Sequence, residues 1–194
     1  MEIVIIKYNA GNIRSVLFAL ERLGYHAVVS DDPGLISKAD KVIFPGVGEA
    51  SSAMSYLHEH GLAQVIQSLK QPVLGICLGM QLLCNFSEEN QTDCLNIINR
   101  PIRQFPQLGL KIPQIGWNDI FGLKGPLFNQ VPEHSYVYFV HSFYAPLSEY
   151  TLASVEYMIP YSAALQNDNF FAVQFHPEKS GKVGEQILTN FLNM

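Results

Sequence analysis

The sequence is poor in cysteine and in positive charge. Its three cysteines are an odd number, and no two stand at the spacing of a zinc or redox motif, which argues against a disulfide framework or a structural zinc site. Only 12 residues are Lys or Arg, against 17 Asp and Glu, and the basic residues form no stripe. Because phosphate backbones are bound mainly through clustered cations, we expect no nucleic-acid partner.

Long apolar runs are also missing. The longest spans only a few residues, whereas a helix that crosses a bilayer needs about 20. No charged region followed by a signal-type apolar segment stands at the N-terminus, and there is no internal repeat or linker. We therefore expect no membrane contact and a cytoplasmic location. A single domain over residues 1–194 is expected, since 48% hydrophobic residues fill a sizeable core.

Short apolar runs alternate with amphipathic segments in the first half. Residues 3–6 read as a buried strand, followed by a turn at Asn9-Ala10-Gly11-Asn12 and a helix that begins near Asn12 and stops near Gly24. Further strands are predicted at 26–29, 42–44 and 72–76. This alternation is typical of a parallel sheet buried on both faces, so we predict a doubly wound, mostly parallel α/β fold with helices on both faces.

The pattern changes in the second half. Between about residues 87 and 113 it fades into polar residues and prolines. Strand-like segments then follow at 136–140, 152–155 and 170–175 with short links, which favours an antiparallel extension of the sheet. Apolar residues at helical spacing across 183–191 predict a final packing helix.

A nucleophile is indicated by Gly75-Ile76-Cys77-Leu78-Gly79. The cysteine stands between two glycines, directly after an apolar strand and before the helix signal of Met80–Leu83, as in a nucleophile elbow. Such a turn presents the sulfur at a helix N-terminus, where the thiolate is favoured. A lone cysteine is more often a buried core residue, but this context outweighs that interpretation. Cys84 and Cys94 lie outside such a context and receive no catalytic role.

The base is expected at His176. It follows the apolar segment 170–175, and active sites of open parallel sheets lie beyond the carboxyl ends of strands. Pro177 fixes the backbone so that the carboxylate of Glu178 turns back to hold the imidazole. An isolated His-x-Glu would be read as a polar strand end, but the cysteine elbow in the same chain favours the catalytic interpretation.

An oxyanion hole is needed because amide cleavage places negative charge on the carbonyl oxygen. The N–H of Leu78 is one expected donor. The second is assigned to Val47, in the glycine-rich segment that follows the third strand; without the other motifs this segment would be read as an ordinary turn. Other residues expected to contact substrate are Gly46, Gly48, His141 and Ser142.

Three blocks stand in the order found in triad-type, or class I, glutamine amidotransferases, and the chain resembles this family over essentially its whole length. The blocks are Pro45-Gly46-Val47-Gly48, Gly75-Ile76-Cys77-Leu78-Gly79-Met80-Gln81 and His176-Pro177-Glu178. The resemblance implies a flavodoxin-like α/β fold, a Cys77-His176-Glu178 triad and a glutamyl thioester intermediate. It also implies that Gln81 helps to hold glutamine, and that no metal or organic cofactor is required.

Within the class, the chain is similar to the glutaminase subunits of imidazole glycerol phosphate synthase. The motifs that carry this similarity are Tyr8-Asn9-Ala10-Gly11-Asn12, Gly116-Trp117-Asn118 and His176-Pro177-Glu178-Lys179-Ser180. It implies a heterodimer with a cyclase subunit, a (β/α)₈ barrel that uses the ammonia in histidine biosynthesis. By analogy, the residues expected toward the docking face are Asn12, Trp117, Asn118 and Lys179. For Trp117, a role as a partly buried aromatic anchor is an equal alternative.

The sequence departs from this family's pattern at Lys7, Asn9 and Gln114, all expected on the docking side. Two other functions remain open. One is the glutaminase of a different synthase, such as that of pyridoxal phosphate or anthranilate synthesis. The other is a regulatory module that kept the fold without activity. The intact Cys-His-Glu set argues against this second alternative.

Overall fold

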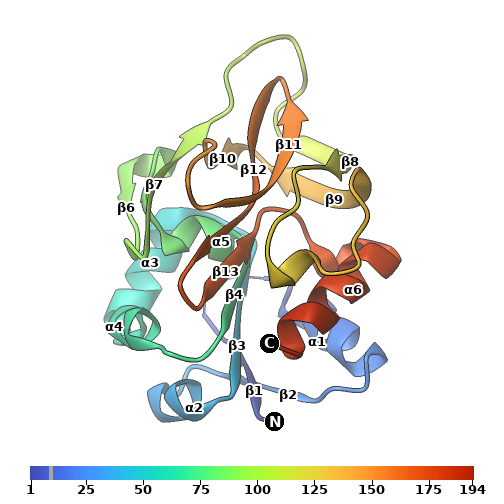
Figure 1. Cartoon of the computed structure of the whole chain (residues 1–194). Coiled ribbons are helices and arrows are strands. Elements are labelled where there is room, and N and C mark those ends of the chain that lie inside the picture. Colours follow the sequence, from blue (N-terminus) through green and yellow to red (C-terminus); the bar gives the residue numbers. More distant parts are fainter. Residues whose placement is uncertain (9–10) are drawn as a thin grey trace.

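The computed structural model describes residues 1–8 and 11–194, and the predicted turn residues Asn9 and Ala10 lie outside the described residues. Its centre is a seven-stranded sheet in the order β11-β12-β13-β4-β3-β1-β2 (Figure 1). Neighbouring strands from β13 through β4, β3 and β1 to β2 are parallel, which confirms the predicted sheet. These strands are β1 (Ile3–Ile6), β2 (Ala27–Ser30), β3 (Lys41–Gly46), β4 (Val73–Cys77) and β13 (Phe170–Val173).

Helices cover both faces of this sheet (Figure 1). In β1, Ile3 and Ile5 belong to the core shared with α1 and α6, whereas Val4 and Ile6 belong to the core shared with the other four helices. Alternate residues of a strand point to opposite faces, so both faces are apolar and buried. The helices are α1 (Ile13–Arg22), α2 (Pro33–Lys38), α3 (Ala50–Glu59), α4 (Leu62–Ser68), α5 (Leu78–Leu83) and α6 (Gly181–Leu192).

The antiparallel extension is present, but its composition differs from the prediction. It consists of β11 (Thr151–Tyr157) and β12 (Ile159–Asn167), which join the sheet through β13. No separate strand was predicted at β12, because its alanines and serine lack strand character. The predicted strand at 136–140 lies elsewhere: β9 (Ser135–His141) pairs with β8 (Gln114–Ile120) in a separate two-stranded sheet.

The segment in which the sequence pattern fades contains regular structure. A four-stranded sheet is built from β10 (Phe143–Tyr144), β7 (Ile98–Gln104), β5 (Cys84–Ser87) and β6 (Thr92–Asp93). Only Ile98 and Ile102 of β7 are fully buried, so this strand lacks a continuous apolar run. Within the described residues, no helix is both long enough and apolar enough to cross a bilayer.

Candidate active site

Cys77 is the last residue of β4 and the residue before α5, as the elbow motif predicts. Its φ of 54° and ψ of −107° are strained for a residue with a side chain. The flanking glycines are needed for packing. A Cβ on Gly79 would lie 1.8 Å from the carbonyl oxygen of Phe44, and one on Gly75 would lie 2.8 Å from Leu83 Cδ1. The elbow therefore tolerates no larger neighbours.

His176 and Glu178 lie together beyond the end of β13, which stops at Val173, two residues earlier than predicted. The Nδ1 atom of His176 is 2.8 Å from Oε1 of Glu178, and both side chains are almost fully buried. Burial alone would lower the pKa of His176. Hydrogen bonding and the negative charges of Cys77 and Glu178 outweigh it and raise the pKa to about 10. His176 therefore carries a proton at neutral pH.

The sulfur of Cys77 has two further neighbours. It lies 3.7 Å from the carbonyl oxygen of Val140, and Nε2 of Gln174 donates to it at 3.8 Å. Oε1 of Gln174 in turn accepts from Gln81 at 3.0 Å. Sequence reasoning missed Gln174, although a polar residue inside an apolar strand segment was a usable signal, because buried amides require partners.

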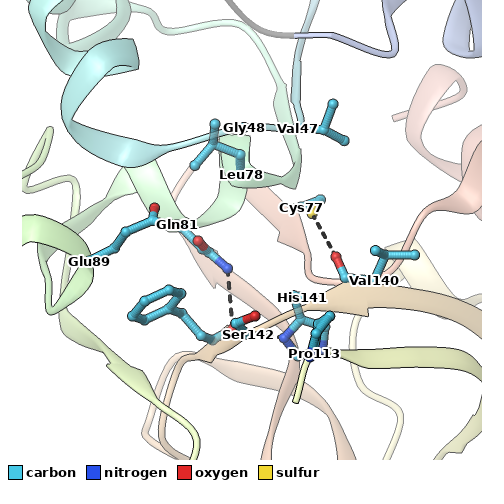
Figure 2. Close-up of a pocket in the computed structure, with 11 residues that line it drawn as sticks. Val47, Gly48, Cys77, Leu78, Gln81, Glu89, Pro113, Val140, His141 and Ser142 are labelled. Carbon is cyan, nitrogen blue, oxygen red and sulfur yellow. Dashed lines mark hydrogen bonds between the residues drawn. The ribbon is translucent and has the colours of Figure 1, made fainter. Parts of the chain in front are cut away.

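A cavity of about 270 Å³ opens beside Cys77 (Figure 2). Six predicted site residues besides Cys77 line it, namely Val47, Gly48, Leu78, Gln81, His141 and Ser142. Gly46 does not line it, because the Tyr8 hydroxyl and Leu78 Cβ pack around its Cα. Four lining residues were not predicted, namely Glu89, Pro113, Val140 and Phe143.

Glu89 is the only carboxylate among the described residues that line this cavity. Its Oε2 accepts the N–H of Ala50 at the start of α3, at 2.8 Å. Burial raises the pKa of Glu89 and the nearby Glu49 charge adds to this, while the bond from Ala50 opposes it. The irregular polar segment around Glu89 offered no periodic signal that would mark it as part of the site.

The segment after β3 reaches the nucleophile directly. The register of β3 and β4 pairs Gly46 with Cys77, so Val47 and Gly48 emerge beside the sulfur. The Val47 carbonyl accepts the N–H of Gly11 at 3.3 Å, which ties this segment to the start of α1. Leu78 is the first residue of α5, so its N–H belongs to the unpaired set at a helix N-terminus.

His141 is held inside the wall of the cavity. Its Nδ1 is 2.7 Å from the Phe143 carbonyl oxygen and its Nε2 is 3.0 Å from the Tyr161 hydroxyl. Burial lowers the pKa of His141 to about 4, so it is neutral at pH 7. Gln114 is 2.7 Å from the same hydroxyl and is only 3% exposed. Its side chain is therefore buried, although Gln114 also lines a hollow beside Trp117.

The other residues expected on the docking side differ in their exposure and contacts. The Trp117 side chain is 56% exposed, which favours an open surface over a buried anchor. Nδ2 of Asn118 donates to the Glu156 carbonyl, and Lys179 is exposed. Lys7 is exposed and lies 3.6 Å from Asp31. Asn12, by contrast, turns its side chain toward Glu178.

The remaining thiols are unsuited to nucleophilic chemistry. Burial raises the pKa of Cys94 to about 12 and raises that of Cys84 further. In residues 1–8 and 11–194, no group of His, Cys, Asp or Glu side chains is arranged to hold a metal ion. Among the three thiols, Cys77 is therefore the candidate nucleophile.

The family model described as glutamine amidotransferase class-I matches residues 4–194. The chain is 55% identical to the imidazole glycerol phosphate synthase subunit HisH of Bacteroides fragilis and 45% identical to that of Yersinia pseudotuberculosis, over 100% of all three chains. The glutaminase domain of Trypanosoma brucei CTPS, solved with bound acivicin, superposes with a TM-score of 0.68 at 15% identity, covering 100% of this chain and 94% of that one. This last similarity concerns the fold alone.

Proposed function

Because this chain belongs to the class-I glutamine amidotransferase family, we propose that it hydrolyses glutamine for imidazole glycerol phosphate synthesis. The ammonia goes to a cyclase subunit, a (β/α)₈ barrel that docks as the second member of a heterodimer. The observation that carries this proposal is the cavity lined by Cys77, the Val47–Gly48 segment and Glu89, together with His176, which contacts Cys77 and is held by Glu178. Full-length similarity to two HisH subunits supports the pathway.

Glutamine binding follows from the charges around the cavity. Glu89 supplies the negative charge that pairs with the α-ammonium group of an amino acid. Gln81 lies beside it, and its amide nitrogen is already engaged by the Phe143 carbonyl and Gln174. Its side-chain oxygen is therefore the atom offered to substrate. The side-chain amide of glutamine then points toward Cys77.

The first half of the reaction breaks the C–N bond of the amide. The Cys77 thiolate attacks the amide carbon, and the N–H groups of Val47 and Leu78 stabilise the resulting oxyanion. His176 donates its proton to the departing nitrogen, so ammonia leaves and a glutamyl thioester remains. Glu178 holds Nδ1 of His176 and leaves the other ring nitrogen for Cys77.

The second half restores the enzyme. His176, now neutral, takes a proton from water as the water oxygen attacks the thioester carbon. The C–S bond breaks, glutamate leaves and Cys77 returns to the thiolate with His176 protonated. Docking of the cyclase keeps the released ammonia from bulk water, where it would be protonated and lose its nucleophilicity. The three free thiols suit a reducing compartment, and we place the reaction in the cytoplasm.

The test is glutamate release from glutamine by the chain alone and with the cyclase subunit from the same source carrying its nucleotide ligand. We expect activity that the cyclase stimulates and that Cys77→Ala abolishes. Substantial activity in the Cys77→Ala variant would refute the assigned nucleophile. Activity stimulated instead by a pyridoxal phosphate or anthranilate synthase partner would reassign the pathway, and no activity with any partner would favour a non-catalytic module.

A further inference from the structure

Asn12 occupies the position before α1 without capping the helix. Its backbone has φ of 75° and ψ of 5°, in the left-handed region, and its side chain makes no hydrogen bond to the first turn. An asparagine that caps a helix normally accepts a backbone N–H and stabilises the helix. Asn12 makes no such bond, so its side chain is available for a contact elsewhere.

The side chain reaches instead into the Cys-His-Glu set. Nδ2 of Asn12 donates to Oε1 of Glu178 and lies 3.4 Å from Nδ1 of His176. The same Oε1 atom is bonded to His176 at 2.8 Å. Two side chains from opposite ends of the chain, Asn12 and His176, therefore meet at one oxygen of the Glu178 carboxylate.

The second oxygen of Glu178 makes this contact important. Oε2 is buried and has no hydrogen-bond partner among the described residues. The orientation of the carboxylate therefore depends on the two donors at Oε1. Without Asn12, His176 alone would hold the group, and rotation about the last side-chain bond would exchange the oxygens. A mobile carboxylate orients an imidazole less well.

We propose that Asn12 is a positioning residue for the reaction, which it serves by fixing the Glu178 carboxylate and, through it, the His176 ring. This inference rests on the proposed function and assigns Asn12 to the triad side of the molecule, where the family resemblance suggested only docking. Asn12 acts through Glu178 and is not among the described residues that line the cavity beside Cys77.

The decisive variant is Asn12→Gly. Glycine adopts φ of 75° without strain, so the variant removes the donor and leaves the backbone preference satisfied. In the complex with the cyclase and its nucleotide ligand, kcat should fall on the order of tenfold to a hundredfold, part of what general acid–base catalysis contributes. The KM for glutamine and the melting temperature should stay close to wild type.

Two further variants sharpen the test. Asn12→Asp keeps the shape but replaces the amide donor with a second carboxylate, so its kcat should fall further than that of Asn12→Gly. Asn96→Gly is the matched control, because Asn96 is exposed, has φ of 50° and lies outside the site. It should leave kcat unchanged.

A reaction that needs no partner distinguishes the positioning role of Asn12 from a docking role. The rate at which a thiol-reactive glutamine analogue labels Cys77 in the isolated chain should fall in Asn12→Gly in proportion to kcat. A kcat within twofold of wild type at saturating cyclase, or a loss explained by weaker cyclase binding with normal labelling, would overturn the inference. A wild-type chain that is neither active nor labelled would overturn the proposed function itself, and this inference with it.

Discussion

The proton on His176 is the feature of a single residue that most directly governs the site. Burial opposes this proton, but hydrogen bonding and charge from Cys77 and Glu178 raise the pKa of His176 to about 10, above the unfolded value of about 6.5. The proton therefore stabilises the fold fully below pH 6.5, and this contribution is lost as pH rises through about 10. The sign is opposite for His141, whose depressed pKa makes its contribution disappear as pH falls toward 4.

We predict that the His176 ring, followed by NMR, stays protonated well above pH 7 and titrates near pH 10. In Cys77→Ser its pKa should fall, because the sulfur is the largest of the influences that raise it. The His141 signal in the same sample serves as the internal reference, since it should titrate near pH 4. A His176 signal that titrates below pH 7 in the wild type would contradict the prediction and leave the leaving group without its proton donor.

At the scale of elements, β1 and β3 are neighbouring parallel strands, and residues that follow or end them pack against each other. A Cβ on Gly46 would lie 2.0 Å from the Tyr8 hydroxyl oxygen and 3.2 Å from Leu78 Cβ. That hydroxyl is buried and has no hydrogen-bond partner among the described residues. Gly46 at the end of β3 therefore leaves space for the Tyr8 hydroxyl, and this unpaired hydroxyl contributes little to the free energy of unfolding.

We predict that Gly46→Ala lowers the free energy of unfolding by about 1–3 kcal/mol, as overpacking does. Tyr8→Phe should be neutral or slightly stabilising, because it removes an unpaired buried hydroxyl. The double variant should recover much of the loss, since the 2.0 Å contact is gone while contacts above 3 Å remain. Chemical denaturation of the four proteins measures this coupling, and strictly additive effects would show that the contact is not the cause.

Elements with strong local chemistry could be predicted from the sequence, and those defined by tertiary contacts could not. The turn between β4 and α5 was predictable because a cysteine flanked by glycines, between an apolar strand and a helix, matches the steric needs of a tight elbow. Strand β12 was not, since its alanines are buried by neighbouring strands rather than by an intrinsic preference. The place of Glu89 was equally unpredictable, because only folding brings its polar segment to the cavity.

The site shows the same division. His176 and Glu178 were predictable from their spacing and their place after an apolar strand. The contact from Asn12 was not, because 166 positions separate it from Glu178 and the resemblance suggested a docking role for it. The burial of the Gln114 side chain was not predictable either, because its direction depends on the pairing of β8 with β9.

At the scale of the whole molecule, apolar side chains are exposed around the β8–β9 hairpin and the loop that precedes it. Large side chains more than half exposed there are Leu108, Leu110, Ile115, Trp117 and Tyr136. A hollow of about 450 Å³ lies among them, lined in part by Trp117, Asn118 and Glu156. Exposed apolar groups gathered in this way are typical of a protein–protein interface. The hairpin also carries His141, so a partner docked here would lie next to the cavity wall.

We predict that Trp117→Ala weakens binding of the cyclase subunit by about tenfold or more, because a large exposed aromatic is the kind of residue that dominates interface energy. Its free energy of unfolding should change little, since the side chain is 56% exposed. Leu35→Ala is the matched control, an apolar residue 51% exposed on α2, far from β8 in Figure 1. Titration calorimetry with the cyclase measures both variants. Equal affinities for Trp117→Ala and Leu35→Ala would move the docking surface away from this hairpin, whereas a loss confined to Trp117→Ala would place the partner on the hairpin that also carries His141 of the cavity.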